Sequence, residues 1–219
     1  MITGMVNLIF DLDDTLYKER DYAKSGLVHI GKKIADLCSQ PDPTSRLIAF
    51  FENGNKDAVG TVCRELGIGD TDRRALLKDM QAHRPMISLS PDAADLIAAL
   101  RTTGQHFAII TDGRSVTQRA KLSSLGLLGG GPCMISEEIG ASKPDPKAFK
   151  MIQKTADAAS FVYVADNPLK DFIAPNLLGW ETIMLKDDGC NIHSQSVEVP
   201  PIARPRRVVS SLLELMEFT

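Results

Sequence analysis

Residues 6–15 read Val-Asn-Leu-Ile-Phe-Asp-Leu-Asp-Asp-Thr, a short and mostly apolar run that passes directly into acidic residues. A run of this length, with β-branched and aromatic side chains and polar flanks, is typical of a strand buried on both faces. Cys133–Ile135 is a weaker candidate for such a strand. Three other runs share the full pattern and predict further buried strands: Phe107–Ile110, Phe161–Ala165 and Thr182–Leu185.

Helical patterns separate these runs. In Pro91–Arg101 apolar residues recur at helical spacing, Ser90 is placed as an N-cap, and Gly104 follows the end. Similar patterns cover Ser115–Leu125 and Pro146–Thr155. Strands that alternate with helices predict a parallel sheet built from right-handed crossovers. The expected fold class is therefore α/β, with a doubly wound, Rossmann-like parallel sheet.

The stretch between Tyr17 and Leu89 breaks the alternation, because its patterns are helical throughout. We expect an all-helical domain, residues 18–89, inserted into a core formed by residues 1–17 and 90–219. Val197–Arg207 is expected to be an extended surface segment, followed by a final helix over Ser210–Phe218. The helices expected in the insert are Leu27–Cys38, Arg46–Glu52, Lys56–Leu66 and Asp72–His83.

Charge and composition exclude several classes of protein. A net charge of -3 argues against a nucleic-acid binder that works through a basic surface. The four cysteines form no CxxC pair, so we expect reduced thiols and no zinc site. The N-terminus lacks the basic region of a signal peptide, and no run reaches the ~18 apolar residues of a membrane span. These features predict a cytoplasmic protein.

Polar residues follow three of the predicted strands where each strand ends. Asp11 and Asp13 follow the first, Thr111 the second and Asp166 the third. Ligands bind beyond the carboxyl ends of parallel strands, so these side chains are expected at one edge of the sheet. Carboxylates gathered there repel one another, and a hard cation such as Mg²⁺ relieves that repulsion. Mg²⁺ would also let an anionic nucleophile approach an anionic phosphate.

Two further features suit a phosphoryl group. Lys143 opens a Lys-Pro-Asp-Pro turn, and a lysine held rigidly there supplies positive charge to a phosphoryl group in transfer. Thr111 offers a hydroxyl, and Asp112-Gly113 leads into a helix N-terminus, where backbone N–H groups can bind phosphate oxygens.

Taken in order, these residues resemble the four motifs of the haloacid-dehalogenase-like superfamily. The resemblance covers residues 1–17 and about 90–190, and the helical insert resembles the family's cap domain. It implies a Mg²⁺-dependent phosphatase that hydrolyses a small phosphorylated metabolite, as a monomer or homodimer, without nucleic-acid or membrane partners. The matching segments are Asp11-Leu12-Asp13-Asp14-Thr15, Thr111, Lys143-Pro144 and Asp166 with Asp171.

The resemblance also implies a role for each matching residue. Asp11 would be the nucleophile that forms an aspartyl-phosphate, and Asp13 the general acid and then the general base. Thr111 and Lys143 would hold the phosphoryl group. Asp112 and Gly113 would lie beside it, and Asp112 stands where the family more often has Asn.

The implied magnesium ligands are the carboxylates of Asp11 and Asp166 and the backbone carbonyl of Asp13. Asp171 would orient Lys143 or a metal-bound water. Three alternatives stay open: a phosphomutase or phosphotransferase, a dehalogenase that uses the same aspartate on carbon, and a non-catalytic module. A dehalogenase needs neither Mg²⁺ nor an acid two residues after the nucleophile, so Asp13, Lys143 and Asp166 together favour phosphate.

Overall fold

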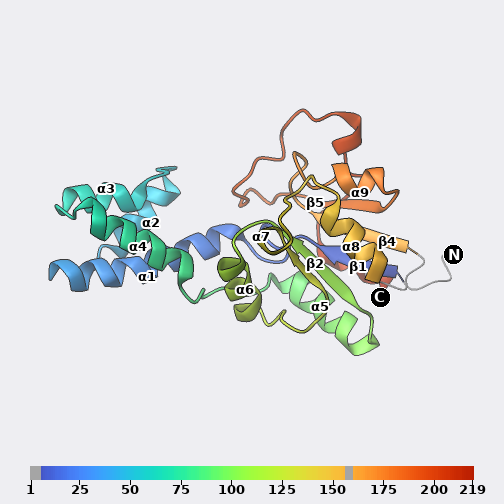
Figure 1. Cartoon of the computed structure of the whole chain (residues 1–219), viewed down its shortest axis with the longest axis horizontal. Helices are drawn as coiled ribbons and strands as arrows, with labels where there is room; N and C mark the ends of the chain where they lie inside the picture. Colours follow the sequence, from blue (N-terminus) through green and yellow to red (C-terminus); the bar gives the residue numbers. More distant parts are fainter. Residues whose placement is uncertain (1–5, 156–159) are drawn as a thin grey trace. The chain divides into compact units, whose positions relative to one another are not determined.

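The computed structural model describes residues 6–155 and 160–219 (Figure 1). The chain forms two compact units, one from Met1–Arg20 and Ser88–Thr219 and the other from Asp21–Ile87. In the described part of the chain, no helix is long and apolar enough to cross a membrane.

A six-stranded sheet in the order β3-β2-β1-β4-β5-β6 is the framework of the first unit. All neighbouring strands pair in parallel. The chain proceeds from β1 toward one edge and then from β4 toward the other, which places the switch point between β1 and β4. This confirms the predicted doubly wound α/β sheet. The strands are β1 (Val6–Phe10), β2 (Phe107–Thr111), β3 (Cys133–Ile135), β4 (Ser160–Ala165), β5 (Glu181–Leu185) and β6 (Arg207–Val209).

Helices flank the sheet (Figure 1). One cluster of the core packs Phe149 of α8 against Tyr163 of β4 and against Trp180, with ring centroids 5.0 and 5.5 Å apart. Ser90 stands at the N-cap of α5 as predicted, but its side chain bonds Asp92 rather than a helical N–H. The helices of this unit are α5 (Pro91–Thr103), α6 (Ser115–Ser124), α7 (Ser136–Ile139), α8 (Lys147–Thr155) and α9 (Ile173–Leu177).

The C-terminal segment differs from the prediction. Within the expected extended segment 197–207, Pro201–Ala203 forms a 3₁₀ turn that buries Ala203, and Arg207 is the first residue of the short strand β6, which continues to the buried Val209. A strand of three residues is too short to show alternation, so its sequence carried no signal. Two 3₁₀ helices border it, η1 (Pro201–Ala203) and η2 (Leu212–Phe218). The predicted final helix therefore exists, with a tighter winding than an α-helix.

The second unit is helical, as predicted for the insert. Its helices bury an apolar cluster centred on Ile30, Ile34 and Leu47. The first helix begins at Glu19, eight residues before the predicted start at Leu27, because its first turns are mostly polar. The helices are α1 (Glu19–Cys38), α2 (Thr44–Glu52), α3 (Ala58–Glu65) and α4 (Asp70–Ala82).

Candidate active site

Three predicted site residues lie at the carboxyl ends of adjacent strands. Phe10 of β1 is in register with Ile109 of β2 and Val164 of β4, so Asp11 follows at the same level as Ile110 and Ala165, and Thr111 and Asp166 lie one residue further along the chain. The Asp11 backbone N–H donates to the Val164 carbonyl at 2.9 Å. Asp11, Thr111 and Asp166 are all at least nine-tenths buried. The topology thus brings residues from distant parts of the chain to one edge of the sheet.

Lys143 lies between two carboxylates. Its Nζ is 2.7 Å from an oxygen of Asp11 and 2.7 Å from an oxygen of Asp171, and its side chain is 1% exposed. It also donates to the Tyr163 hydroxyl at 3.1 Å. Burial lowers the pKa of Lys143, but the charges of Asp11 and Asp171 raise it well above its ordinary value. Lys143 is therefore a permanent cation beside Asp11.

The carboxylates of Asp11, Asp166 and Asp171 offer oxygens that lie within 4.8 Å of one another. Burial, together with the charges of Asp11 and Asp171, raises the pKa of Asp166 to about 8. Burial also raises the pKa of Asp11 to about 6, in spite of Lys143. This is the charge imbalance that a bound divalent cation relieves, and oxygen donors suit Mg²⁺.

Asp171 differs from the other two acids in its contacts. One of its oxygens pairs with Lys143, and the other accepts a hydrogen bond from the Asn167 backbone N–H at 2.9 Å. Asp11 and Asp166 are thus the better carboxylate ligands for a cation. The Asp13 carbonyl stays a predicted third ligand.

Asp13 has surroundings of its own. Its carboxylate accepts hydrogen bonds from Lys121 Nζ at 2.7 Å, from Gln118 Nε2 at 3.1 Å and from the Tyr17 hydroxyl. Burial raises the pKa of Asp13, but the charge of Lys121 and these three hydrogen bonds lower it by more. The side chain is thus ionised at neutral pH, the form that a general base requires.

The sequence did not predict that Tyr17, Gln118 and Lys121 contact Asp13. A signal was nevertheless present: the buried residues of α6 are Gln118, Lys121 and Leu122, two of them polar. A helix packed against a core is expected to be apolar on that face, so polar residues there indicate a specific partner.

Thr111, Asp112 and Gly113 form the second predicted segment. The Thr111 hydroxyl accepts a hydrogen bond from Gln118 Nε2 at 2.8 Å. Asp112 does not cap the following helix: its oxygens accept from the Lys143 backbone N–H at 3.1 Å and from Lys170 Nζ at 3.3 Å. Lys170 thereby offsets the negative charge of Asp112, which stands where the family more often has a neutral Asn.

The N-terminus of α6 is already hydrogen bonded in this structure. The Gly113 N–H donates to Ser136 Oγ at 2.9 Å and the Ser115 N–H to Glu137 Oε2 at 2.7 Å. Gly113 has a φ of 142°, and a Cβ placed there would lie 3.0 Å from Gln118 Nε2. The glycine therefore serves the close approach of Gln118, and its predicted contact with phosphate stays a prediction.

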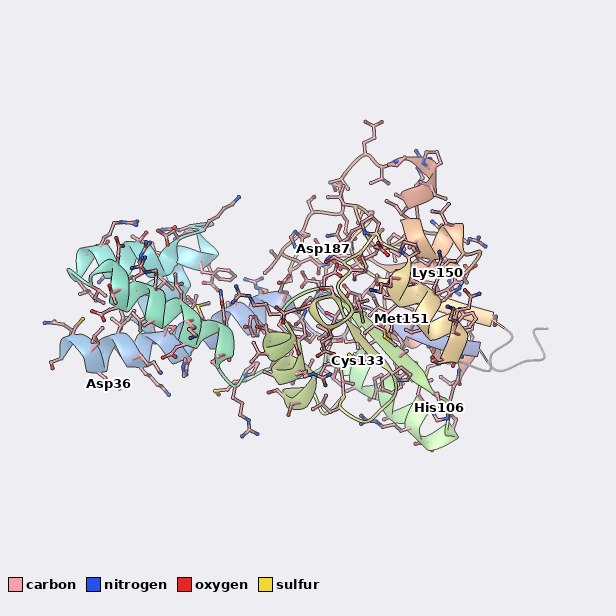
Figure 2. The ribbon with its side chains drawn as sticks, in the orientation of Figure 1. Asp36, His106, Cys133, Lys150, Met151 and Asp187 are labelled. Atoms are coloured by element: carbon pink, nitrogen blue, oxygen red, sulfur yellow. The ribbon has the colours of Figure 1, made fainter. Side chains whose placement is uncertain are left out.

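A loop after β5 also reaches the site. Asn191 Nδ2 donates to Asp166 Oδ2 at 3.1 Å, and Gln195 Nε2 donates to the Asp166 carbonyl at 2.8 Å. The loop folds around Asp187, labelled in Figure 2, whose Oδ1 accepts the Asn191 backbone N–H at 3.0 Å. These contacts fix the orientation of Asp166. Turn residues alone did not reveal them, because the partner lies far away in the sequence.

The fold and the site have counterparts among known proteins. The family model described as haloacid dehalogenase-like hydrolase matches residues 8–185. The chain belongs to this family. The match confirms the resemblance inferred from the motifs and assigns the chain to a family of hydrolases.

Three curated relatives of this haloacid dehalogenase-like hydrolase are phosphatases. Ribulose-1,5-bisphosphate 5-phosphatase of Halopiger xanaduensis is 27% identical over 206 residues, 81% of this chain and 83% of the relative. Glyceraldehyde 3-phosphate phosphatase of Methanopyrus kandleri is 24% identical over 230 residues, 95% and 97% of the two chains. Phosphoserine phosphatase of Thermus thermophilus is 33% identical, but over 52% of this chain and 47% of its own length. Their shared class is phosphoric monoester hydrolase.

Solved structures agree on the fold. The putative hydrolase YfnB of Bacillus subtilis, bound to magnesium, has a TM-score of 0.62 at 20% identity over 97% of both chains. A dehalogenase has the same TM-score of 0.62 and the same 20% identity over 100% of this chain and 99% of its own. Because a magnesium-bound hydrolase and a dehalogenase share this fold, the fold does not decide the reaction, which must be inferred from the site residues.

Proposed function

We propose that this hydrolase is a Mg²⁺-dependent phosphatase that cleaves a small phosphomonoester through an aspartyl-phosphate on Asp11. The observation that carries the proposal is the buried Lys143, held between Asp11 and Asp171 with the Asp166 carboxylate alongside. Phosphoryl transfer needs such a concentration of charge, because the substrate is an anion and so is the nucleophile. The shared class of the three curated relatives supports the same reaction.

In the first step, an Asp11 oxygen attacks phosphorus and the bond to the ester oxygen breaks. Lys143 neutralises Asp11 on one side and faces the phosphoryl oxygens as charge develops on them. Thr111 is placed by Gln118 to donate its hydroxyl to a phosphoryl oxygen. When bound by Asp11 and Asp166, Mg²⁺ would supply further positive charge to the phosphoryl group.

Asp13 handles the protons of both steps. Asp13, ionised in the free site, would take up a proton as the phosphate dianion binds, and it gives this proton to the departing ester oxygen, which leaves as an alcohol. Ionised, it then takes a proton from the water that attacks phosphorus, and the bond from Asp11 to phosphorus breaks. The products are the alcohol and inorganic phosphate; Asp11 is regenerated as a carboxylate, and Asp13 gives up its remaining proton when phosphate leaves.

The dehalogenase alternative accounts for fewer of these residues. Displacement of halide from carbon by an aspartate needs no metal ion and so gives no role to Asp166. Burying this carboxylate is nevertheless unfavourable, because burial raises its pKa to about 8. A dehalogenase also needs no acid at position 13, so it does not explain the three hydrogen-bond donors around Asp13. A phosphatase uses both features. The substrate class we propose is a small phosphorylated metabolite, and the helical unit would serve as the cap that the family resemblance implies.

The test is phosphate release from a panel of phosphometabolites, with Mg²⁺ and with a chelator. We expect the wild-type protein to release phosphate only with Mg²⁺, and Asp11→Asn to fall to background while it keeps its circular dichroism spectrum. Asp95→Asn, at an exposed acid of α5, is the matched control and should match wild type. Retained turnover in Asp11→Asn would remove the mechanism, and return of phosphate to a sugar substrate would indicate a mutase.

A further inference from the structure

Three hydrogen-bond donors converge on the Asp13 carboxylate. Lys121 and Tyr17 both donate to Oδ1, and Gln118 donates to Oδ2. Lys121 has a side chain that is 4% exposed, and its ammonium lies 5.9 Å from the centre of the Tyr17 ring. A carboxylate held by three fixed donors has little freedom to rotate, so its two oxygens keep distinct positions.

Gln118 joins Asp13 to the phosphate side of the site. Its Nε2 lies 2.8 Å from Thr111 Oγ1, 3.1 Å from Asp13 Oδ2 and 2.6 Å from the Asp112 carbonyl. The residue is 2% exposed. Its amide nitrogen has only two hydrogens for these three acceptors. Asp13 Oδ2 is the most distant acceptor, at 3.1 Å, so it is held the most weakly.

Stability alone does not account for a lysine at position 121. Desolvating an ammonium and a carboxylate costs several kcal/mol per ion, and well-packed apolar residues in place of a buried ion pair are often neutral or stabilising. Leu122, the next residue, shows that this part of α6 can bury an apolar side chain. A buried lysine and glutamine that both face one acid therefore indicate a requirement of the site.

We propose that Lys121, Gln118 and Tyr17 are positioning residues that hold Asp13 for proton transfer to the leaving oxygen. This inference rests on the proposed phosphatase function. Two donors already occupy Oδ1 of Asp13, so Oδ2 carries the proton that is transferred to the ester oxygen. Oδ2 and the Thr111 hydroxyl both accept hydrogen bonds from Gln118. Gln118 thus sets the distance between the proton donor and the hydroxyl that binds the phosphoryl group.

The consequence can be measured through the leaving group. Dinitrophenyl phosphate releases a phenolate that needs no proton, whereas phenyl phosphate releases one that does. The ratio kcat/KM reports only the steps up to cleavage of the ester bond. General acid catalysis contributes roughly 10²–10⁴-fold, so Lys121→Met, Tyr17→Phe and Gln118→Leu should each lose at least about tenfold on phenyl phosphate. On dinitrophenyl phosphate each should lose less than about threefold.

Three controls separate positioning from general damage. Arg119→Met, on the same helix at an exposed pair with Glu138, should leave both substrates unaffected. Lys121→Arg keeps the cation and should recover part of the phenyl phosphate rate. In an Asp13→Asn background, Lys121→Met should cause no further loss, because it acts through Asp13.

The outcomes are distinguishable. If the wild-type enzyme hydrolyses neither ester with Mg²⁺, the proposed function itself is wrong. If the wild type is active but the variants lose the same factor on both esters, or if Lys121→Met and Asp13→Asn are additive, the positioning role is overturned. Tyr17→Phe removes a single oxygen atom, so it tests the inference even if the variants of α6 fail to fold.

Discussion

Replacing Lys143 with methionine should destabilise the protein more at alkaline than at acid pH. The substitution removes the only lysine that pairs with Asp11 or Asp171 among the described residues, and both acids stay buried. Breaking a buried pair by removing one partner costs about 3–5 kcal/mol. The free energy of unfolding of a typical domain is about 5–15 kcal/mol, so the loss is large enough to measure.

The pH dependence follows from protonation of Asp11. Its pKa is already raised to about 6 by burial, and removing the lysine that lowers it should raise it further. A carboxyl whose folded pKa exceeds its unfolded value binds more protons when folded, so stability is lost as pH rises through the folded pKa. One such proton changes stability by about 1.4 kcal/mol per pH unit. Between pH values of roughly 6.5 and 8.5 the deficit of the variant should therefore grow by up to about 2.7 kcal/mol.

Urea unfolding of the metal-free wild-type and Lys143→Met proteins at several pH values measures the difference in their free energies of unfolding directly. Lys150→Met is the matched control, because Lys150 is exposed on α8, as the side chain labelled in Figure 2 shows. It should change stability by less than about 0.5 kcal/mol at every pH. A deficit of Lys143→Met that is constant with pH, or that grows as pH falls, would contradict the arrangement of charges around Asp11.

Further predictions concern metal binding, the helical unit and the α6 turn. Burial raises the pKa of Asp166 to about 8, so Mg²⁺ must displace a proton; calorimetry should show proton release below that pH and weaker binding as pH falls. Asp166→Asn should abolish stabilisation by Mg²⁺ in thermal melts. Burial lowers the pKa of His83, whose ring bonds Ser25 at 3.1 Å, so the unfolded chain binds the extra proton and stability should fall as pH drops below about 6.5. His83→Gln should flatten that decline in urea unfolding. Gly113→Ala should reduce kcat at least tenfold because its Cβ would displace Gln118.

Much of the fold could be predicted because its signals are local. The apolar run before Asp11 and the runs before Thr111 and Asp166 are short, β-branched and flanked by polar residues, and each became a strand of the sheet. The weak candidate Cys133–Ile135 also became a strand. The C-terminal strand Arg207–Val209 was missed because pairing with β5 creates it. No property of those three residues distinguishes them from the surrounding loop.

The site was predictable where chemistry restricts the residue type. Asp11 and Lys143 stand out because a carboxylate after a strand and a lysine in a proline-flanked turn have few structural uses. Lys121 did not stand out, because a lysine on a helix is usually exposed. Its partner Asp13 lies 108 residues earlier in the sequence. Only the packing of α6 showed that this lysine is buried.

The two lysines and the acids around them leave room in the charge balance for the cation that we propose. Lys143 pairs with Asp11 and Asp171, and Lys121 pairs with Asp13, so both lysines that are buried among the described residues already have acidic partners. The Asp166 carboxylate accepts one hydrogen bond from Asn191, a neutral side chain, and no lysine pairs with it among the described residues. Burial accordingly raises its pKa to about 8, whereas the charge of Lys121 and the hydrogen bonds around Asp13 outweigh burial and lower the pKa there.

The same distribution of charge separates the roles of Asp11 and Asp13, although they are only two residues apart. Asp11 faces the edge where Asp166 lies, so a cation bound there would stabilise its ionised form, as a nucleophile requires. Asp13 is held on the side of α6 by Gln118 and Lys121, whose contacts with it form without a bound cation. An approaching phosphate dianion would therefore act on Asp13 through its own charge and favour its protonation, which is the form that a general acid needs. In the proposed mechanism, the charge of the substrate would prepare Asp13 for the first step, and departure of the alcohol would leave it ionised for the second.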